Sequence, residues 1–484
     1  MFRVRRCGDN MSGSVLLILF SVAASAGLPA RDSAECSPFG IHDPGFPSPQ
    51  NDIAAAGARW VRYAGGDGIV WDAVERRPGE FDWTRNDWLY LATARLGVRM
   101  FVSTISANRA YGVEHGRLPG DTAAYLRFIR QAVERYDGDG VDDAPGSPVV
   151  DVWQVENEPD IFWRDSPQSY ALLLAQSGRV IREANPRARV AIAGVGTPEG
   201  FGGRRDFYSP VFAELDRLRG GSQDRYFDIF DFHWYPFSYC YDYMIEPPEP
   251  LPGGRRINFT DYVRDIRLRL GQHGYADAPI FVTETAQYDG TPLPSRSFPP
   301  GPERRPLPFH SELSQAAFLV KMYVSSLAAG IDKVFWVTLT EWHNFGGDTN
   351  GVFDHVGLVN NPANVGLSHR KLAYYAYRKL ADILEGSDWH QVTTVRDSGG
   401  VRVFEFRKRG KPVWVAWNDG TGEKPLVLSD FTAGRGKVTE AVPDCRSGRD
   451  VTDYQAAFRT RELVPSAGEV RLVLAEVPVF IEAE

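Results

Sequence analysis

The chain has 484 residues, of which 43 % are hydrophobic and 24 % charged. This composition is ordinary for a soluble globular protein with one large domain and a smaller one. The formal net charge of −8 argues against a nucleic acid or an anionic membrane as a partner, because both favour proteins with basic surfaces. The composition leaves the oligomeric state open.

The first 26 residues have the pattern of an export signal. Three arginines, Arg3, Arg5 and Arg6, precede the apolar run VLLILFSVAA, and the small residues Ala24-Ser25-Ala26 follow it. A charged region, a short apolar region and a small-residue cleavage site define a signal peptide. We therefore expect residues 1–26 to be removed and the mature protein to be secreted or periplasmic. No later stretch approaches transmembrane length, so we expect no membrane span in the mature chain.

From Phe39 onward, short β-rich runs alternate with amphipathic helical patterns. Eight runs are predicted as strands: 39–42, 59–63, 98–105, 149–155, 189–195, 227–235, 279–285 and 333–339. Helical spacing of apolar residues is clearest at 122–136, 170–184, 314–329 and 371–384. Strands that alternate with helices pair in parallel. Eight such units predict a (β/α)₈ barrel over residues 27–388. A doubly wound open sheet is the competing arrangement, but the glycine-rich phosphate turn typical of it is missing after the first strand.

The sequence pattern changes after about Ser387. Apolar and polar residues alternate in VRVFEFRKRG, KPVWVAWNDG and EVRLVLAEVPVFIEA, and Gly and Asp-Gly turns separate the runs. This pattern predicts an antiparallel β-sandwich over residues 389–484.

The carboxyl ends of the predicted barrel strands carry polar and aromatic side chains, and in such barrels the active site lies at these ends. Glu158 ends the fourth strand and Glu284 the seventh. The other candidates are His42, Arg62, Asn157, His233, Tyr235 and Trp336, with Trp342 beyond the last strand. A single glutamate at a strand end is usually structural. Two that converge on one mouth suit the cleavage of a glycosidic bond, where one carboxylic acid protonates the leaving oxygen while a carboxylate attacks or activates water.

Several motifs, in order along the chain, resemble those of clan A retaining glycoside hydrolases. They are GARWVRY with the following WDAVERRPGEFDWT, then WQVENEP, FDFHWYP and IFVTETA. The sequence pattern is most similar to that of family 39, which includes β-xylosidases, α-iduronidases and exopolysaccharide endoglycosidases. Its members also carry a β-sandwich after the barrel. Family 39 more often has Trp-Asn-Glu-Pro in the fourth strand, where this chain has Glu156 before Asn157. Families 5 and 42 remain open alternatives.

The resemblance implies a role for each candidate residue. Glu158 would be the general acid/base, and Glu284 the nucleophile. Asn157 would bind the sugar 2-hydroxyl, and Arg62 would pair with Glu284 and lower its pKa. His233 and Tyr235 would lie near the nucleophile, Trp336 would form a flat platform under the sugar, and His42 would also line the substrate site. The substrate would be an oligo- or polysaccharide, with neither cofactor nor metal, and the two carboxyl groups would stand about 5–5.5 Å apart. By strand alternation we also expect Glu156 to neighbour Glu158.

Three other points follow from the sequence. The loop at 135–146 contains Asp137, Asp139, Asp142 and Asp143, but its spacing fails the EF-hand pattern, so a solvated turn is favoured over a calcium site. Without the leader, Cys36, Cys240 and Cys445 allow at most one disulfide, and the sequence does not choose the pair. The alternative function is a catalytically silent barrel that binds glycans.

Overall fold

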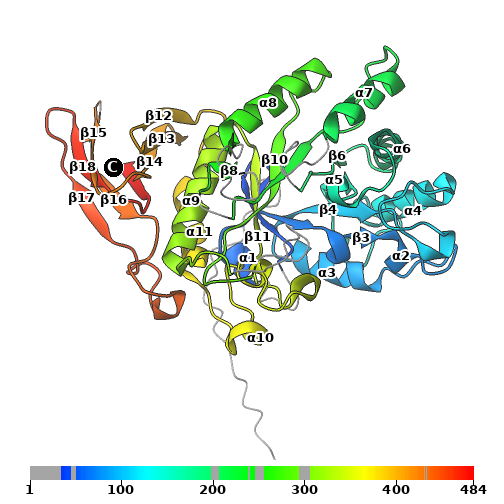
Figure 1. The fold of residues 1–484 in the computed structure, drawn as a ribbon, viewed down its shortest axis with the longest axis horizontal. Helices are drawn as coiled ribbons and strands as arrows, with labels where there is room; N and C mark the ends of the chain where they lie inside the picture. Colours follow the sequence, from blue (N-terminus) through cyan, green and yellow to red (C-terminus); the bar gives the residue numbers. More distant parts are fainter. Residues whose placement is uncertain are drawn as a thin grey trace, which may run out of the picture.

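The structure is a computed structural model, and it describes residues 34–44, 51–196, 198, 206–237, 240–245, 256–293, 306–429, 431 and 433–484. The predicted leader, 1–26, lies outside these residues. Figure 1 shows a large α/β domain beside a smaller domain of strands that contains the C-terminus. Every helix in the described ranges is too short or too polar to cross a bilayer.

Eight parallel strands form the barrel. They are β1 (Phe39–His42), β2 (Trp60–Tyr63), β4 (Arg99–Ile105), β5 (Val152–Val155), β6 (Arg189–Ile192), β7 (Phe230–Trp234), β10 (Ile280–Thr285) and β11 (Lys333–Val337). The order β6-β5-β4-β2-β1-β11-β10-β7 is closed by isolated parallel bridges from Ala191 to Ile229 and from Val195 to Phe232. The predicted (β/α)₈ barrel is therefore confirmed, and each predicted strand overlaps an observed one.

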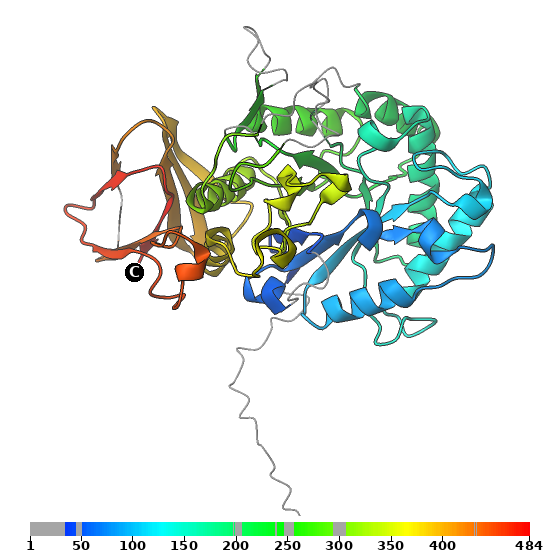
Figure 2. The same cartoon turned by 60° about the horizontal axis from the view of Figure 1, so that its bottom comes forward.

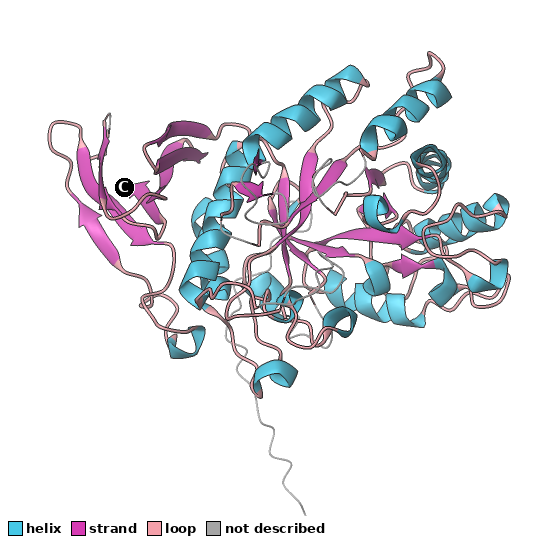
Figure 3. Cartoon of the chain, viewed as in Figure 1, coloured by secondary structure: helices cyan, strands magenta, loops and turns pink. Residues whose placement is uncertain are grey.

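Helices follow the barrel strands and cover the outside of the sheet, as Figure 3 shows. They are α1 (Asn51–Ala55), α3 (Thr84–Ala94), α4 (Thr122–Arg135), α6 (Pro167–Ala184), α7 (Tyr208–Arg219), α8 (Phe259–Gln272), α9 (Glu312–Ala328) and α11 (Leu372–Leu384). Short polar side chains cap the N-termini of several of them: Asp121 accepts a hydrogen bond from the amide of Ala124, and Ser166 accepts one from the amide of Ser169. Such caps satisfy amides that have no partner within the helix.

Smaller elements decorate the loops of the barrel. They are β3 (Ile69–Val70), α2 (Trp71–Val74), α5 (Pro159–Phe162), the β8 (Tyr243–Ile245) and β9 (Arg256–Asn258) hairpin, and α10 (Pro362–Val365). β3 pairs with β4, and α5 directly follows Glu158. These additions therefore extend the loops at the carboxyl ends of the strands.

The barrel interior changes from apolar to polar along the strands. One buried cluster inside the barrel consists of Trp60, Phe101, Val152, Ala191, Ile229, Phe281 and Phe335. Two residues further along three of these strands stand Arg62, Gln154 and Asp231, all fully buried. Side chains two apart on a strand share a face, so the polar residues lie directly above the apolar floor.

The C-terminal domain contains two antiparallel sheets. The larger has the order β12-β13-β14-β19-β16-β17, with β12 at Thr393–Ser398, β13 at Val401–Lys408, β14 at Lys411–Asn418, β16 at Gly436–Glu440, β17 at Thr460–Leu463 and β19 at Val479–Ala483. The smaller pairs β15 (Lys424–Leu428) with β18 (Val470–Leu474). The predicted β-sandwich is confirmed. The boundary at residue 388 stays a prediction.

The sandwich contacts the barrel through α9 and α11, which lie between the two domains in Figure 2. On one face of β13, Phe404 and Phe406 belong to the main hydrophobic core, whereas Val401 and Val403 face the second sheet. Lys321 of α9 pairs with Asp419 at 3.0 Å. Both apolar contact and an ion pair therefore join the domains.

Candidate active site

Glu158 lies on a tight segment that leaves the barrel at the end of β5. The strand ladder stops at Val155, and Glu156 and Glu158 then adopt left-handed backbone angles, with φ of 69° and 44°. This conformation costs about 1–2 kcal/mol per residue for side chains with a Cβ. The amide of Glu156 donates to Thr104 O at 2.9 Å and that of Glu158 to Gly194 O at 3.1 Å. The neighbouring strands thus hold the segment in place.

Two glycines at the end of β6 leave room for the site. A Cβ on Gly196 would lie 2.7 Å from Glu158 Oε1 and 2.5 Å from Ile161 Cδ1. A Cβ on Gly194 would lie 2.8 Å from the His233 ring. Larger residues at either position would displace the side chains that face the mouth.

Glu284 lies near the end of β10, where the pairing register shifts between Val282 and Glu284. Its Oε1 accepts a hydrogen bond from Arg62 Nη1 at 2.7 Å, and its Oε2 accepts one from Tyr235 Oη at 2.6 Å. Burial by itself would raise the pKa of Glu284, but the nearby cations His233 and Arg62 and the Tyr235 hydroxyl lower it well below its usual range. Glu284 is therefore a carboxylate at neutral pH, as its predicted pairing with Arg62 requires.

The guanidinium of Arg62 organises the base of the site. Besides Glu284, it donates to Gln154 Oε1 at 2.7 and 3.2 Å and to Asn157 Oδ1 at 2.5 Å. His42 Nδ1 lies 2.9 Å from Nη1, and because arginine only donates, this nitrogen is the acceptor. Burial, together with Arg62, lowers the pKa of His42 to about 3. A neutral imidazole fits this contact.

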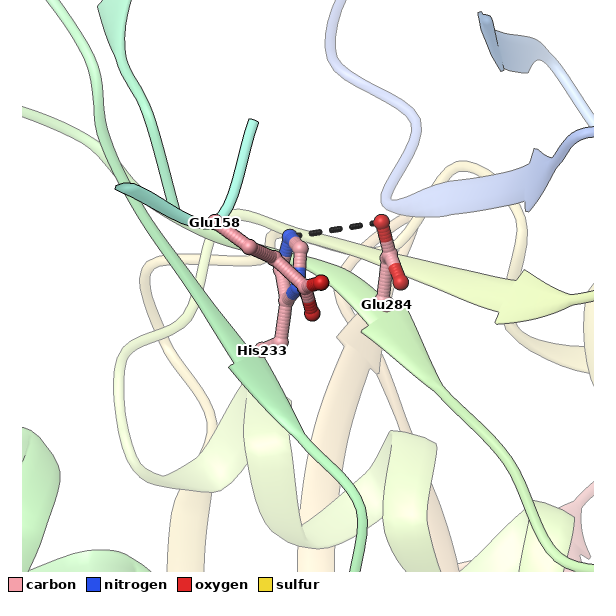
Figure 4. A group of neighbouring side chains, drawn as sticks. All are labelled: Glu158, His233 and Glu284. Carbon is pink, nitrogen blue, oxygen red and sulfur yellow. Dashed lines mark hydrogen bonds and ion pairs between the residues drawn. The ribbon is translucent and has the colours of Figure 1, made fainter. Parts of the chain in front are cut away.

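His233 contacts both glutamates; Figure 4 shows its ring beside the Glu158 side chain, with the ion pair to Glu284 dashed. Its Nδ1 is 2.9 Å from Glu158 Oε1, and its Nε2 is 3.5 Å from Glu284 Oε1. Burial alone would lower the pKa of His233, but Glu284 and Glu158 raise it above its ordinary value. One atom from each of the three side chains lies within 4.8 Å of the other two. The structure thus brings together Glu158, Glu284, His233, Tyr235, Arg62, Asn157 and His42, all of which the sequence singled out.

Trp336 is a correction. Phe335 points into the barrel, so the alternation of the strand turns Trp336 outward. Trp336 is fully buried, donates from Nε1 to Val356 O at 2.9 Å and packs edge-on against Phe318 of α9. It cannot form a platform under a sugar.

Glu156 is a second correction. Its carboxylate Oε1 accepts the amide of Ser106 at 2.7 Å, and the residue is 2 % exposed. The expectation that Glu156 shares a side with Glu158 assumed regular strand alternation, which ends at Val155. Burial raises the pKa of Glu156 to about 7.

Aromatic side chains surround the mouth beside Tyr235. Phe353 contacts Tyr235 edge-on at 5.7 Å between ring centres, and Trp342 stacks on Phe345 at 4.1 Å. Phe237 stacks on Tyr235, and Phe345 is 45 % exposed. These five rings come from the segments after β7 and β11. The exposed ring of Phe345 makes this wall a surface on which a flat ligand could stack.

Gln154 and Asp231 are site residues that the sequence analysis missed. Gln154 links Arg62 to Asp231, donating from Nε2 to Asp231 Oδ2 at 2.5 Å. Thr283 Oγ1 also donates to Asp231 Oδ2, at 2.8 Å. For Asp231 a signal was available, because it precedes the site residue His233 by two positions on the same strand; for Gln154 the sequence offered none.

The acidic loop is closed by hydrogen bonds from its own backbone, and the three described cysteines are unpaired. Asp137, Asp139 and Asp143 have oxygens within 4.8 Å of one another. Each, however, accepts backbone amides of its own loop, such as that of Val141 on Asp139 at 2.8 Å. This is the hydrogen bonding of a closed turn. Cys36, Cys240 and Cys445 are free thiols.

No protein-family model and no curated protein sequence matches the chain. Solved structures do. A family 39 glycoside hydrolase from Bacteroides cellulosilyticus WH2 superposes with a TM-score of 0.67 at 18 % identity, over 94 % of this chain and 82 % of that one. This chain has the fold of a family 39 glycoside hydrolase. The GH39 enzyme from Xanthomonas axonopodis pv. citri gives a TM-score of 0.58 at 15 % identity, covering 95 % of this chain and 96 % of that one.

A monomeric β-xylosidase from Caulobacter crescentus CB15 is similar over 95 % of this chain and 97 % of its own, with a TM-score of 0.56 at 16 % identity. A GH30 endoxylanase from Clostridium papyrosolvens C71 gives a TM-score of 0.55 at 14 % identity, over 92 % of this chain and 95 % of that one. The resemblance to clan A and family 39 is therefore confirmed at the level of the fold.

Proposed function

We propose that the protein is a retaining glycoside hydrolase that cleaves O-glycosidic bonds of an oligo- or polysaccharide. The observation that carries the proposal is the approach of Glu158 and Glu284, whose nearest oxygens lie within 4.8 Å. Retaining enzymes hold their carboxyl groups about 5–5.5 Å apart, whereas inverting enzymes leave about 6.5–9.5 Å for a water molecule. The short approach favours retention.

The surroundings of the two glutamates suit different roles. Glu284, ionised beside Arg62, would attack the anomeric carbon as the glycosidic bond breaks and form a covalent glycosyl ester. Glu158, whose side chain is 17 % exposed, would give its proton to the leaving oxygen. In the second step Glu158 would take a proton from water, the resulting hydroxide oxygen would bond to the anomeric carbon, and the carboxylate of Glu284 would leave.

The first test is hydrolysis of a panel of aryl glycosides, beginning with β-xylosides because one structural neighbour is a β-xylosidase. Release of the phenol supports the proposal. A wild type that binds glycans and hydrolyses none of the panel would favour the silent binding barrel instead. We further propose that the predicted leader directs the protein to the periplasm or the exterior, which fractionation of the producing cells would test.

The roles of the glutamates are separated by Glu158→Ala. With a good leaving group the first step needs little protonation and should survive, while the second step slows for lack of a base. The glycosyl intermediate should accumulate, giving a burst of phenol, and azide should restore turnover. Azide should also rescue Glu284→Gly, and there the product should have the opposite anomeric configuration, because azide attacks the substrate directly when the nucleophile is missing. Azide rescue with that inverted product in the Glu158 variant would show that the roles are reversed.

A further inference from the structure

Glu156 is a buried carboxyl group directly before the two residues proposed for substrate chemistry, Asn157 and Glu158. It points away from the mouth, and its Oε1 binds the amide of Ser106, just beyond the end of β4, at 2.7 Å. The carboxyl group is close enough to Tyr125 of α4 and Tyr170 of α6 to add to the rise that burial produces in both their pKa values. Glu156 thus lies between the strand ends and the helix layer.

A buried carboxyl group is costly unless it forms hydrogen bonds that repay its desolvation. Burial raises the pKa of Glu156, and the hydrogen bond from Ser106 lowers it by a smaller amount. An apolar residue would avoid the charge at this position, but it could not accept the hydrogen bond from the Ser106 amide. The position therefore needs an explanation other than packing.

The explanation lies in the backbone. Residues other than glycine keep left-handed backbone angles only when the surrounding structure holds them there. Two such residues, Glu156 and Glu158, flank Asn157. Two backbone hydrogen bonds hold the segment to its neighbours, from Glu156 N to Thr104 O and from Glu158 N to Gly194 O. The side chains of Asn157 and Glu158 contact Arg62 and His233, inside the mouth. The Glu156 side chain instead accepts a backbone amide, that of Ser106 at the end of β4, so it ties the backbone of the segment to the neighbouring strand on the side away from the mouth.

We propose that Glu156 is a positioning residue whose carboxylate, by holding the Ser106 amide, fixes the left-handed segment that aims Glu158 at the glycosidic oxygen. The inference rests on the proposed function, because it assigns Glu156 to the acid/base half of that mechanism. Glu284 lies on β10 and is held by Arg62 and Tyr235. Arg62 contacts Asn157 in the segment but is also held by Gln154 within β5, so loosening the segment should displace Glu158 more than the nucleophile.

This separation sets the experiment. Glu156→Ala and Glu156→Gln are assayed on two aryl glycosides of the sugar that the wild type accepts, one with a phenyl and one with a 2,4-dinitrophenyl leaving group. Phenol leaves poorly without a proton, whereas dinitrophenol hardly needs one. Misplacing a catalytic group by about 1 Å can cost on the order of 100-fold in rate. We expect Glu156→Ala to lose about 10- to 100-fold in kcat on the phenyl glycoside and under about threefold in its first step on the dinitrophenyl glycoside.

Glu156→Gln is the matched rescue, since its amide oxygen can still accept the Ser106 amide. It should recover most of the rate on the phenyl glycoside. Glu80→Gln, at an exposed site, controls for the loss of one negative charge and should behave as the wild type.

The outcomes are separable. A wild type inactive on the whole glycoside panel would contradict the proposed function. An active wild type with Glu156→Ala equally impaired on both substrates would mean a general structural role and would overturn the inference. So would a Glu156→Ala variant as active as the wild type on both. Thermal melts of each variant verify that the protein is folded.

Discussion

Charged side chains are buried at both ends of the barrel. At the mouth, Arg62 is surrounded by acceptors, among them Glu284, Gln154 and Asn157. At the floor, Lys333 donates to the backbone oxygens of Glu35 and Ser37 at 2.6 and 2.9 Å.

The electrostatic consequences are opposite. At the mouth a cation and a carboxylate face each other, and the pKa of Glu284 falls. At the floor Lys333 lies 4.7 Å from the ring centre of Trp60, with Arg189 also near that ring. Burial, followed by the charge of Arg189, lowers the pKa of Lys333 to about 7. The mouth keeps Arg62 and Glu284 charged, which the proposed chemistry requires, whereas the floor closes the barrel and lowers the pKa of its lysine.

The largest effect that tests this comparison is expected at the mouth. Glu284→Gln keeps the shape and an acceptor for Arg62, but it removes the attacking oxygen. Turnover should fall by at least about 10⁴-fold on every substrate, which is the size of loss expected when one member of a set of cooperating catalytic residues is removed. The measurement is kcat for phenol release. Residual activity within tenfold of the wild type would show that the nucleophile lies elsewhere.

Arg62→Met should have the next largest effect. Without the guanidinium, the pKa of Glu284 rises toward its burial-raised value, and the carboxylate is protonated at a higher pH. Activity at neutral pH should fall by about 10²-fold, and the acidic limb of the kcat/KM profile should move to higher pH. An unshifted acidic limb would mean that His233 alone controls the ionisation of Glu284.

Lys333→Met tests the floor, and its effect should appear in stability rather than in activity. The folded pKa of Lys333, about 7, lies below the unfolded value of 10.5, so the unfolded chain binds more protons between these values. The stability of the wild type relative to the variant should therefore rise as pH increases from 7 to 9, by about 2 kcal/mol. Denaturant unfolding at the two pH values measures this difference, and kcat should stay within about twofold. A pH-independent difference would show that Lys333 is not desolvated.

The smallest effects should distinguish the mouth from the outer layer. Phe345→Ala removes an exposed ring of the aromatic wall and should raise KM about 3- to 10-fold, in line with the loss of one stacking contact. Trp336→Phe, on the helix side of β11, should leave KM unchanged at a temperature where both proteins are folded. If the Trp336 variant had the larger KM, the assignment of inner and outer faces at β11 would be wrong.

The sequence predicted the barrel well because its strands are buried on both faces and read as apolar runs between helical patterns. It also identified most of the site, since parallel strands present their carboxyl ends together. The errors have local causes. Trp336 was expected to face the substrate, although its neighbour Phe335 is the residue of β11 that points into the barrel. Glu156 was expected to neighbour Glu158 because strand alternation was assumed to continue past Val155, the last paired residue.

Other features depend on contacts that a single sequence does not encode visibly. Gln154 and Asp231 are polar residues within strands, and their importance depends on Arg62, which contacts Gln154 from β2 and is linked through it to Asp231. The aromatic wall joins segments more than a hundred residues apart, Tyr235 with Phe345 and Phe353. Neither spacing nor periodicity indicates such a meeting.

The ion pair between Lys321 and Asp419 bears on how the two domains could be recombined. The side chain of Lys321 is 7 % exposed, and Tyr241, in the segment that follows Tyr235 after β7, donates to the same aspartate at 2.6 Å. Removing the sandwich would leave the buried Lys321 without its counter-ion. It would also remove the partner of Tyr241, in the segment that follows Tyr235, and Tyr235 donates a hydrogen bond to Glu284. The sandwich is therefore no interchangeable module: in chimeras, barrel and sandwich would have to be transplanted together.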